Sequence, residues 1–148
     1  MPKNLTLVAM NAAHRALIAV SAGRLGWRLG GAPVLELTTT GRRTGRPRTV
    51  MLTSPLQLDG DLVVVASRGG DDTHPAWYLN LVADPRVQVS RDGGPPVPMR
   101  ARVLTAEERA EHWPAVTASF GVYARYQHRT ERVIPLVVLE ATDRAVRG

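Results

Sequence analysis

Arginines and glycines gather in two short segments of this 148-residue chain. The first segment, Gly41–Arg48, holds four arginines and no acidic residue, and the second is Ser67-Arg68-Gly69-Gly70. Arginine stays charged at any working pH and its planar fork of donors matches phosphate and carboxylate oxygens, while glycine lets the backbone approach an anion. Each segment alone could be an ordinary solvated turn. Two such corners at strand ends in one small domain favour a shared site for a single anion.

Aromatic and amide side chains follow the second corner. Trp77, Tyr78 and Asn80 come after Pro75, which we expect at the first position of a short helix, capped by His74 or by the threonine before it. Trp77 could be an apolar wall for a flat cofactor, with Asn80 as a donor, or it could be an ordinary core residue.

Tyr123 and Tyr126 are three residues apart, so they share a helix face. A tyrosine hydroxyl can donate a hydrogen bond or a proton to a substrate oxygen, and the alternative is simple packing with a surface hydroxyl. The chain has no cysteine, its four histidines are scattered, and no Ser-His-Asp order or carboxylate pair is present. We therefore expect no metal, and an enzyme of this sequence would take its reactive group from a cofactor.

The composition limits the classes of partner. The net charge of +6 favours an acidic partner, such as nucleic acid, anionic lipid or a phosphorylated small molecule. The chain has one Phe, three Tyr and three Trp and lacks nucleic-acid-binding motifs, so we expect no nucleic acid. With 44% hydrophobic and 22% charged residues, it should fold as one domain that spans residues 1–148.

Residues 4–29, within an N-terminal segment 1–31, are predicted to form an amphipathic helix because their polar side chains recur at helical steps. This helix could dock on its own domain, or its cationic edge could contact an anionic membrane. Asn11, His14 and Arg15 make it too polar to span a bilayer and a poor secretory signal. We therefore expect a cytoplasmic protein, with the inner face of the cell membrane as an alternative location.

The rest of the chain is predicted as consecutive strands with two later helices. Apolar or alternating runs predict strands at 34–39, 49–53, 56–58, 62–66, 87–90, 97–104 and 133–140. Asp59-Gly60 predicts a tight hairpin, and Pro135, which lacks an N–H, should lie at an edge or a strand start. Thr105 and Glu108 form a capping box for a helix to about residue 119, before a second helical piece over 121–132. These elements predict a mostly antiparallel, barrel-like α+β domain.

Several motifs together resemble the deazaflavin-dependent nitroreductases, also described as coenzyme F420-dependent quinone reductases. The resemblance covers nearly the whole chain from Val34, and its motifs are residues 34–48, 64–70, 74–89, 106–109, 123–127 and 132–138. Each motif is weak alone, and the combination is specific. The resemblance implies an FMN-binding-type split β-barrel and a reduced deazaflavin, coenzyme F420, that delivers hydride to a menaquinone-like quinone or to a nitro acceptor.

The resemblance also implies the site residues. Arg43, Thr44 and Gly45 would meet the phosphate or acidic tail of the cofactor, and Tyr123 and Tyr126 would face the acceptor, with Tyr123 orienting or protonating it. The cofactor-binding positions that it implies are Arg43, Thr44, Gly45, Arg48, Thr49, Val50, Met51, Leu52, Thr53, Ser54, Val65, Ala66, Ser67, Arg68, Ala76, Trp77, Tyr78, Leu79 and Asn80. The alternative is a non-catalytic split-barrel protein that binds F420, flavin mononucleotide or an apolar ligand.

Overall fold

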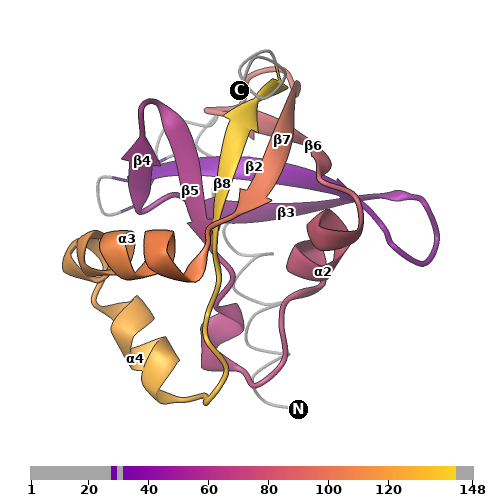
Figure 1. Ribbon diagram of the computed structural model, residues 1–148. Helices are drawn as coiled ribbons and strands as arrows, with labels where there is room; N and C mark the ends of the chain where they lie inside the picture. Colours follow the sequence, from indigo (N-terminus) through magenta and orange to yellow (C-terminus); the bar gives the residue numbers. More distant parts are fainter. Residues whose placement is uncertain (1–27, 30–31, 143–148) are drawn as a thin grey trace.

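The computed structural model describes residues 28–29 and 32–142, which form an antiparallel sheet with helices packed against it (Figure 1). The strands are β1 (Arg28–Leu29), β2 (Ala32–Thr40), β3 (Pro47–Thr53), β4 (Leu56–Leu58), β5 (Asp61–Val65), β6 (Arg86–Arg91), β7 (Val97–Val103) and β8 (Leu136–Ala141). The helices are the 3-10 turn η1 (Arg68–Gly70), α2 (Ala76–Ala83), α3 (Ala106–Ser119) and α4 (Val122–His128). Within these residues, every helix is too short or too polar to cross a membrane.

The strand order is β1-β2-β6-β7-β8-β5-β4, and β3 pairs with β2 as well. The nine-residue β2 therefore carries three antiparallel neighbours, which are β1 at Ala32 and Pro33, β3 along Val34–Thr40 and β6 along Leu35–Thr38. Ser54 and Pro55 join β3 to β4, but these two edge strands form no ladder in the described part of the chain, so the sheet is not closed. In Figure 1, β2 and β3 cross β5, β7 and β8 at a steep angle.

Alternation along the central strands β5 and β8 builds an apolar layer on each face of the sheet. The first core consists of Leu35, Leu37, Leu62, Val64, Ala66, Trp77, Leu81, Val87, Val89, Met99, Ala101, Val137 and Leu139. The second core consists of Val63, Val65, Leu104, Val116, Ile134, Leu136 and Val138. Because both faces of β5 and β8 are buried, their sequences are continuous apolar runs rather than alternating ones.

The helices divide between the two cores. α2 contributes Trp77 and Leu81 to the first core, whereas residues of α3 and α4 pack against the second. α3 begins at the predicted capping box, in which Thr105 Oγ1 accepts from Glu108 N at 3.2 Å and Glu108 Oε1 accepts from Thr105 N at 2.9 Å. The Asp59-Gly60 hairpin is also confirmed, with both residues at positive φ between β4 and β5.

Three local expectations need correction. Arg28 and Leu29 do not continue the predicted helix, because their backbone pairs antiparallel with Pro33 and Ala32 of β2 to form β1. The rest of that predicted helix lies outside the described residues. The strand predicted at 133–140 begins only at Leu136, so Pro135 stands at a strand start, which is one of its two predicted positions, and not at an edge, because β8 lies between β7 and β5. Pro75 caps α2 from an extended conformation instead of starting it, since its carbonyl accepts from Tyr78 N.

Candidate functional site

The loop between β2 and β3 is closed by its own backbone. Gly41 N donates to Arg46 O at 2.8 Å, and Gly45 N donates to Gly41 O at 2.7 Å. Gly45 has a φ of 72°, which favours glycine, and a Cβ on Gly41 would lie 3.1 Å from Arg46 O. These two backbone bonds close the loop while residues 42–48 are exposed, and the loop projects beyond the sheet (Figure 1).

One arginine of this loop fastens it to α2. The backbone N and Nη1 of Arg42 both donate to Asn80 Oδ1, at 3.2 and 3.0 Å. Asn80 is only 3% exposed, and its Nδ2 donates to Thr39 Oγ1 at 3.1 Å. Hydrogen bonds of Arg42 and Asn80 therefore connect the end of β2, the loop and α2. The Asn80 amide predicted as a cofactor donor is engaged with protein at both of its ends.

A cavity of about 620 Å³ lies between the loop, β3 and α2. It is lined by Gly41, Arg42, Arg43, Thr44, Pro47, Arg48, Thr49, Val50, Ala76, Trp77 and Asn80. The lining holds three arginines and no acidic residue, so the local potential is positive. Trp77 is 8% exposed and belongs to the first core while it also borders the cavity, and its contact with a cofactor stays a prediction.

The structure separates several other predicted positions from this cavity. Met51 is buried against Val34, and Thr53 pairs with Val34 across the β2–β3 ladder. Ser54 is buried beside a second cavity, and Gly45 borders a third. The remaining positions pack in the cores or on α2, namely Leu52, Tyr78 and Ala66 at the first core, Val65 in the second, and Leu79 half-buried on α2.

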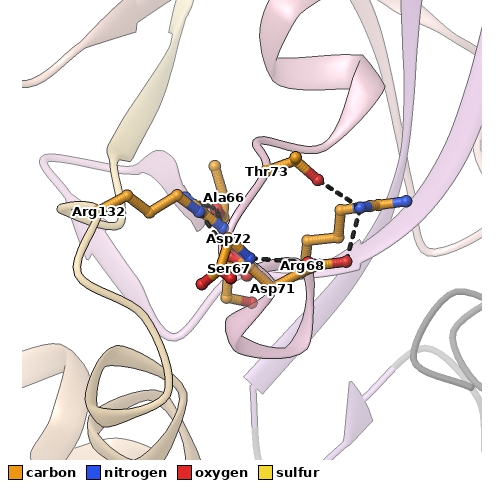
Figure 2. A network of polar contacts seen from close by, with 7 residues as sticks. All are labelled: Ala66, Ser67, Arg68, Asp71, Asp72, Thr73 and Arg132. Atoms are coloured by element: carbon orange, nitrogen blue, oxygen red, sulfur yellow. Dashed lines mark hydrogen bonds and ion pairs between the residues drawn. The ribbon is translucent and has the colours of Figure 1, made fainter. Parts of the chain in front are cut away.

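The second arginine corner is a tight left-handed turn. Arg68, Gly69 and Gly70 have φ values of 46°, 64° and 83°. Arg68 Nη1 donates to Asp71 Oδ2 at 2.7 Å and to Thr73 Oγ1 at 2.6 Å (Figure 2). Its charge is therefore partly neutralised by its own loop, and Arg68 is not among the residues that line the 620 Å³ cavity.

Arg132, which follows α4, ties this corner to the other end of the chain (Figure 2). Its guanidinium donates to Ala66 O at 3.2 Å, to Ser67 O at 2.8 Å and to Asp71 O at 2.7 Å. Nη1 also lies 3.1 Å from His74 Nδ1, which must be the unprotonated ring nitrogen because arginine only donates. Burial, and secondly the charge of Arg132, lower the pKa of His74, in agreement with a neutral ring.

The two predicted acceptor residues lie on α4. Tyr123 and Tyr126 pack against the second core, so they are on the sheet face opposite that of Trp77. Their ring centroids are 6.1 Å apart in an edge-to-face arrangement. Burial, with a smaller contribution from Tyr126, raises the pKa of Tyr123 to about 12, so its hydroxyl stays protonated at neutral pH. Neither tyrosine lines the 620 Å³ cavity, and their contact with an acceptor stays a prediction.

Comparison with known proteins identifies the family. The sequence profile of the F420H(2)-dependent quinone reductase family matches residues 11–141, which is most of the chain. The chain belongs to this family. An F420H(2)-dependent quinone reductase of Mycobacterium tuberculosis (strain ATCC 25618 / H37Rv) is 41% identical over 136 residues, which cover 85% of this chain and 86% of that protein.

Solved structures agree with this family. A structure described as an F420-H2 dependent reductase (FDR-A) has 39% identity and a TM-score of 0.63, and the match covers 73% of this chain and 94% of that one. A second, described as a domain-swapped dimer, has 35% identity and a TM-score of 0.65, with 87% of this chain and 96% of that chain covered.

Two parts of the site in this quinone reductase family member were not predicted from its sequence. Arg132 contacts residues that lie 58 to 66 positions earlier in the chain, and Arg42 contacts Asn80, which lies 38 positions later. Nothing in the spacing distinguishes Arg132 from the other arginines, although it falls within a stretch that carries the resemblance. Arg42 and Asn80 both belong to motifs that the sequence analysis singled out, but their contact with each other was not predicted.

Proposed function

We propose that this protein is an oxidoreductase that transfers hydride from reduced coenzyme F420 to a quinone such as menaquinone. The observation that carries the proposal is the 620 Å³ cavity, in which three arginines and an indole line one space without any acidic residue. Such a lining suits a ligand that has a flat ring and an acidic tail. Membership of the F420H(2)-dependent quinone reductase family supports the same cofactor.

The residues present fit this cofactor. Arg43, Thr44 and Arg48 would hold its phosphate or acidic tail, and Gly45 would keep the loop in the required conformation. Val50 and Trp77 would bound the ring system. When bound, the reduced deazaflavin supplies the hydride. The protein's own contribution is to position the reactants and to neutralise negative charge.

The other implied positions are proposed with more indirect roles. Thr49, Ala76 and Asn80 also border the cavity, and Asn80 would act by holding the loop rather than by touching the ring. Ser67 and Arg68 would form a second donor-rich corner for the phosphate. The buried residues of the implied set would act through the packing of the strands rather than by touching the cofactor, and these are Met51, Ser54, Val65 and Ala66.

We propose that Tyr123 orients or protonates the acceptor, with Tyr126 beside it, because a hydroxyl with a pKa of about 12 remains a donor. The Tyr123→Phe variant should lower kcat for a quinone by about 100-fold, since general acid catalysis contributes on this order, and should leave the Kd for F420 unchanged. Steady-state kinetics and a cofactor titration measure the two quantities. An unchanged kcat would show that the Tyr123 hydroxyl has no role in the reaction. A nitro compound is the second acceptor class to assay.

The direct test is a spectrophotometric assay with purified protein, reduced coenzyme F420 and a water-soluble menaquinone analogue. We expect cofactor oxidation in step with quinone reduction, and no turnover when reduced flavin mononucleotide replaces F420. Tight F420 binding without turnover on any quinone or nitro compound would favour the non-catalytic carrier. Preferential binding of flavin mononucleotide would overturn the cofactor assignment.

Two finer proposals concern the fold and the membrane. The open antiparallel sheet, whose β2 and β3 cross β5, β7 and β8 steeply, supports a split β-barrel (Figure 1). Contact of residues 4–29 with an anionic membrane is proposed from their sequence pattern, since they lie outside the described residues. Flotation with anionic liposomes should show binding that is lost when residues 1–29 are deleted. Equal binding after the deletion would exclude this contact.

A further inference from the structure

The peptide groups at the end of β5 are held in one orientation by Arg132. Its Nη1 and Nη2 donate to Ala66 O, and Nη2 also donates to Ser67 O (Figure 2). The described residues contain no cis peptide bond. In a trans peptide the carbonyl and the following N–H point in opposite directions. The N–H groups of Ser67 and Arg68 therefore point away from Arg132.

These two N–H groups have no acceptor within residues 32–142. The neighbouring N–H groups are paired, since Ala66 N donates to Pro135 O, Gly70 N to Ser67 O and Asp71 N to Arg68 O. Ser67 is 8% exposed, and a nearly buried backbone donor without a partner is costly unless a ligand or water completes it. Two adjacent N–H groups that point the same way on a left-handed turn form a concave donor pair suited to an anion.

We propose that Arg132 is a positioning residue for the cofactor, which fixes the Ala66–Arg68 backbone so that the N–H groups of Ser67 and Arg68 face the cofactor's phosphate. This inference rests on the proposed function. Arg132 does not line the cavity and acts through the loop. The planar fork suits this role because one guanidinium reaches Ala66, Ser67, Asp71 and His74 together, which the single ammonium of a lysine cannot do.

The test compares two ligands, coenzyme F420 and its phosphate-free deazaflavin chromophore, titrated into the full-length wild type and the Arg132→Lys variant. Arg132→Lys should weaken F420 binding about tenfold, as expected for displaced charge-assisted bonds, and change chromophore binding by no more than about twofold. Equal weakening of both ligands, or of neither, would overturn the positioning role. Failure of the wild type to bind F420 would instead overturn the proposed function.

Arg109→Lys is the matched control. Arg109 is also a half-buried guanidinium that holds a carbonyl, with Nε donating to Ile134 O at 2.7 Å, and it stacks on Trp113, but it does not touch the Ala66–His74 loop. This variant should lose stability while the ratio of the two ligand affinities stays at the wild-type value. A shift in that ratio equal to that of Arg132→Lys would show that any buried arginine has the effect, and would contradict the proposal.

A second pair of variants tests the N–H group itself, in case Arg132→Lys does not fold. Ser67 has a φ of −80°, which proline can adopt, so Ser67→Pro removes the N–H with little backbone change. Ser67→Ala removes only the hydroxyl and serves as its reference. Ser67→Pro should bind F420 about tenfold more weakly than Ser67→Ala and the chromophore equally well. Equal F420 affinity in the two variants would contradict the proposal.

Discussion

Neighbouring arginines of the β2–β3 loop differ in what holds their side chains. Arg42 is committed to protein, because Asn80 Oδ1 accepts both from its side chain and from its backbone. Arg43 borders the same cavity, and no hydrogen bond or ion pair joins its side chain to another residue of the described chain. From the sequence alone, the two arginines are equally good candidates for binding an anion. Geometry assigns Arg42 to the shape of the site and Arg43 to its charge.

The salt dependence of F420 binding should separate these two roles. In the Arg43→Ala variant we expect F420 affinity to fall about tenfold or more, because a charge-assisted contact to the anionic cofactor is lost, and its dependence on salt concentration to flatten. Arg42→Ala should also weaken binding, since the loop is released from α2, but its salt dependence should match that of the wild type. Titrations over a range of salt concentrations measure both. The same flattening in both variants would mean that Arg42 contacts the anion as well.

At the scale of elements, the packing of η1 against α4 depends on a residue without a side chain. Gly70 has a φ of 83°, and a Cβ there would lie 2.7 Å from Tyr126 O. Arg129 Nη1 also donates a hydrogen bond to Gly69 O at 3.2 Å. The second arginine corner and the proposed acceptor helix are therefore packed directly against each other.

Gly70→Ala should lower the free energy of unfolding by about 2–3 kcal/mol, of which about 1 kcal/mol is backbone strain and the rest is the clash with α4. Gly60→Ala is the control, because Gly60 has a φ of 87° but a Cβ there would meet no atom within 4 Å. Gly60→Ala should lower the free energy of unfolding only by the backbone strain, about 1 kcal/mol. Urea unfolding of both variants gives the difference. Equal losses would show that η1 does not depend on this close approach to α4.

The loop between η1 and α2 should make stability depend on pH through His74. Its pKa in the folded protein lies below 6.5, so below that pH the unfolded chain binds more protons and the free energy of unfolding decreases. Above pH 6.5 this stabilisation is fully present. The His74→Gln variant should show a smaller loss of stability on acidification, whereas His128→Gln, which changes an exposed residue of α4, serves as the control. An identical acid profile for His74→Gln and the wild type would contradict this contribution.

Elements that depend on local sequence were predictable, and contacts that depend on the whole fold were not. The Asp59-Gly60 hairpin and the Thr105–Glu108 capping box require only residues a few positions apart, and both form as expected. For Pro135 the sequence left an edge position and a strand start open, and only the strand order of the whole sheet decides for the strand start. The contacts of Arg132 were not predicted for the same reason, since its partners lie more than 50 positions earlier in the sequence.

At the scale of the molecule, the two halves of the proposed site lie on different faces of the sheet. The cavity of Trp77 adjoins the first core, and Tyr123 packs against the second. The Ser67–Gly70 corner carries the bonds of Arg132 and contacts α4 through Gly70. The net charge of +6 would assist the encounter with an anionic cofactor.

The central claim is that the cofactor ring lies against Trp77, and the side-chain indole N–H signals of the protein in a two-dimensional NMR titration with coenzyme F420 test it most directly. The ring current of a flat cofactor should shift the Trp77 signal, with the same Kd as the cofactor titration of the binding assay. The signal of Trp113, which packs against the second core under Arg109, should stay in place. A saturating shift of Trp113 with an unmoved Trp77 would contradict the claim and place the cofactor on the other face of the sheet.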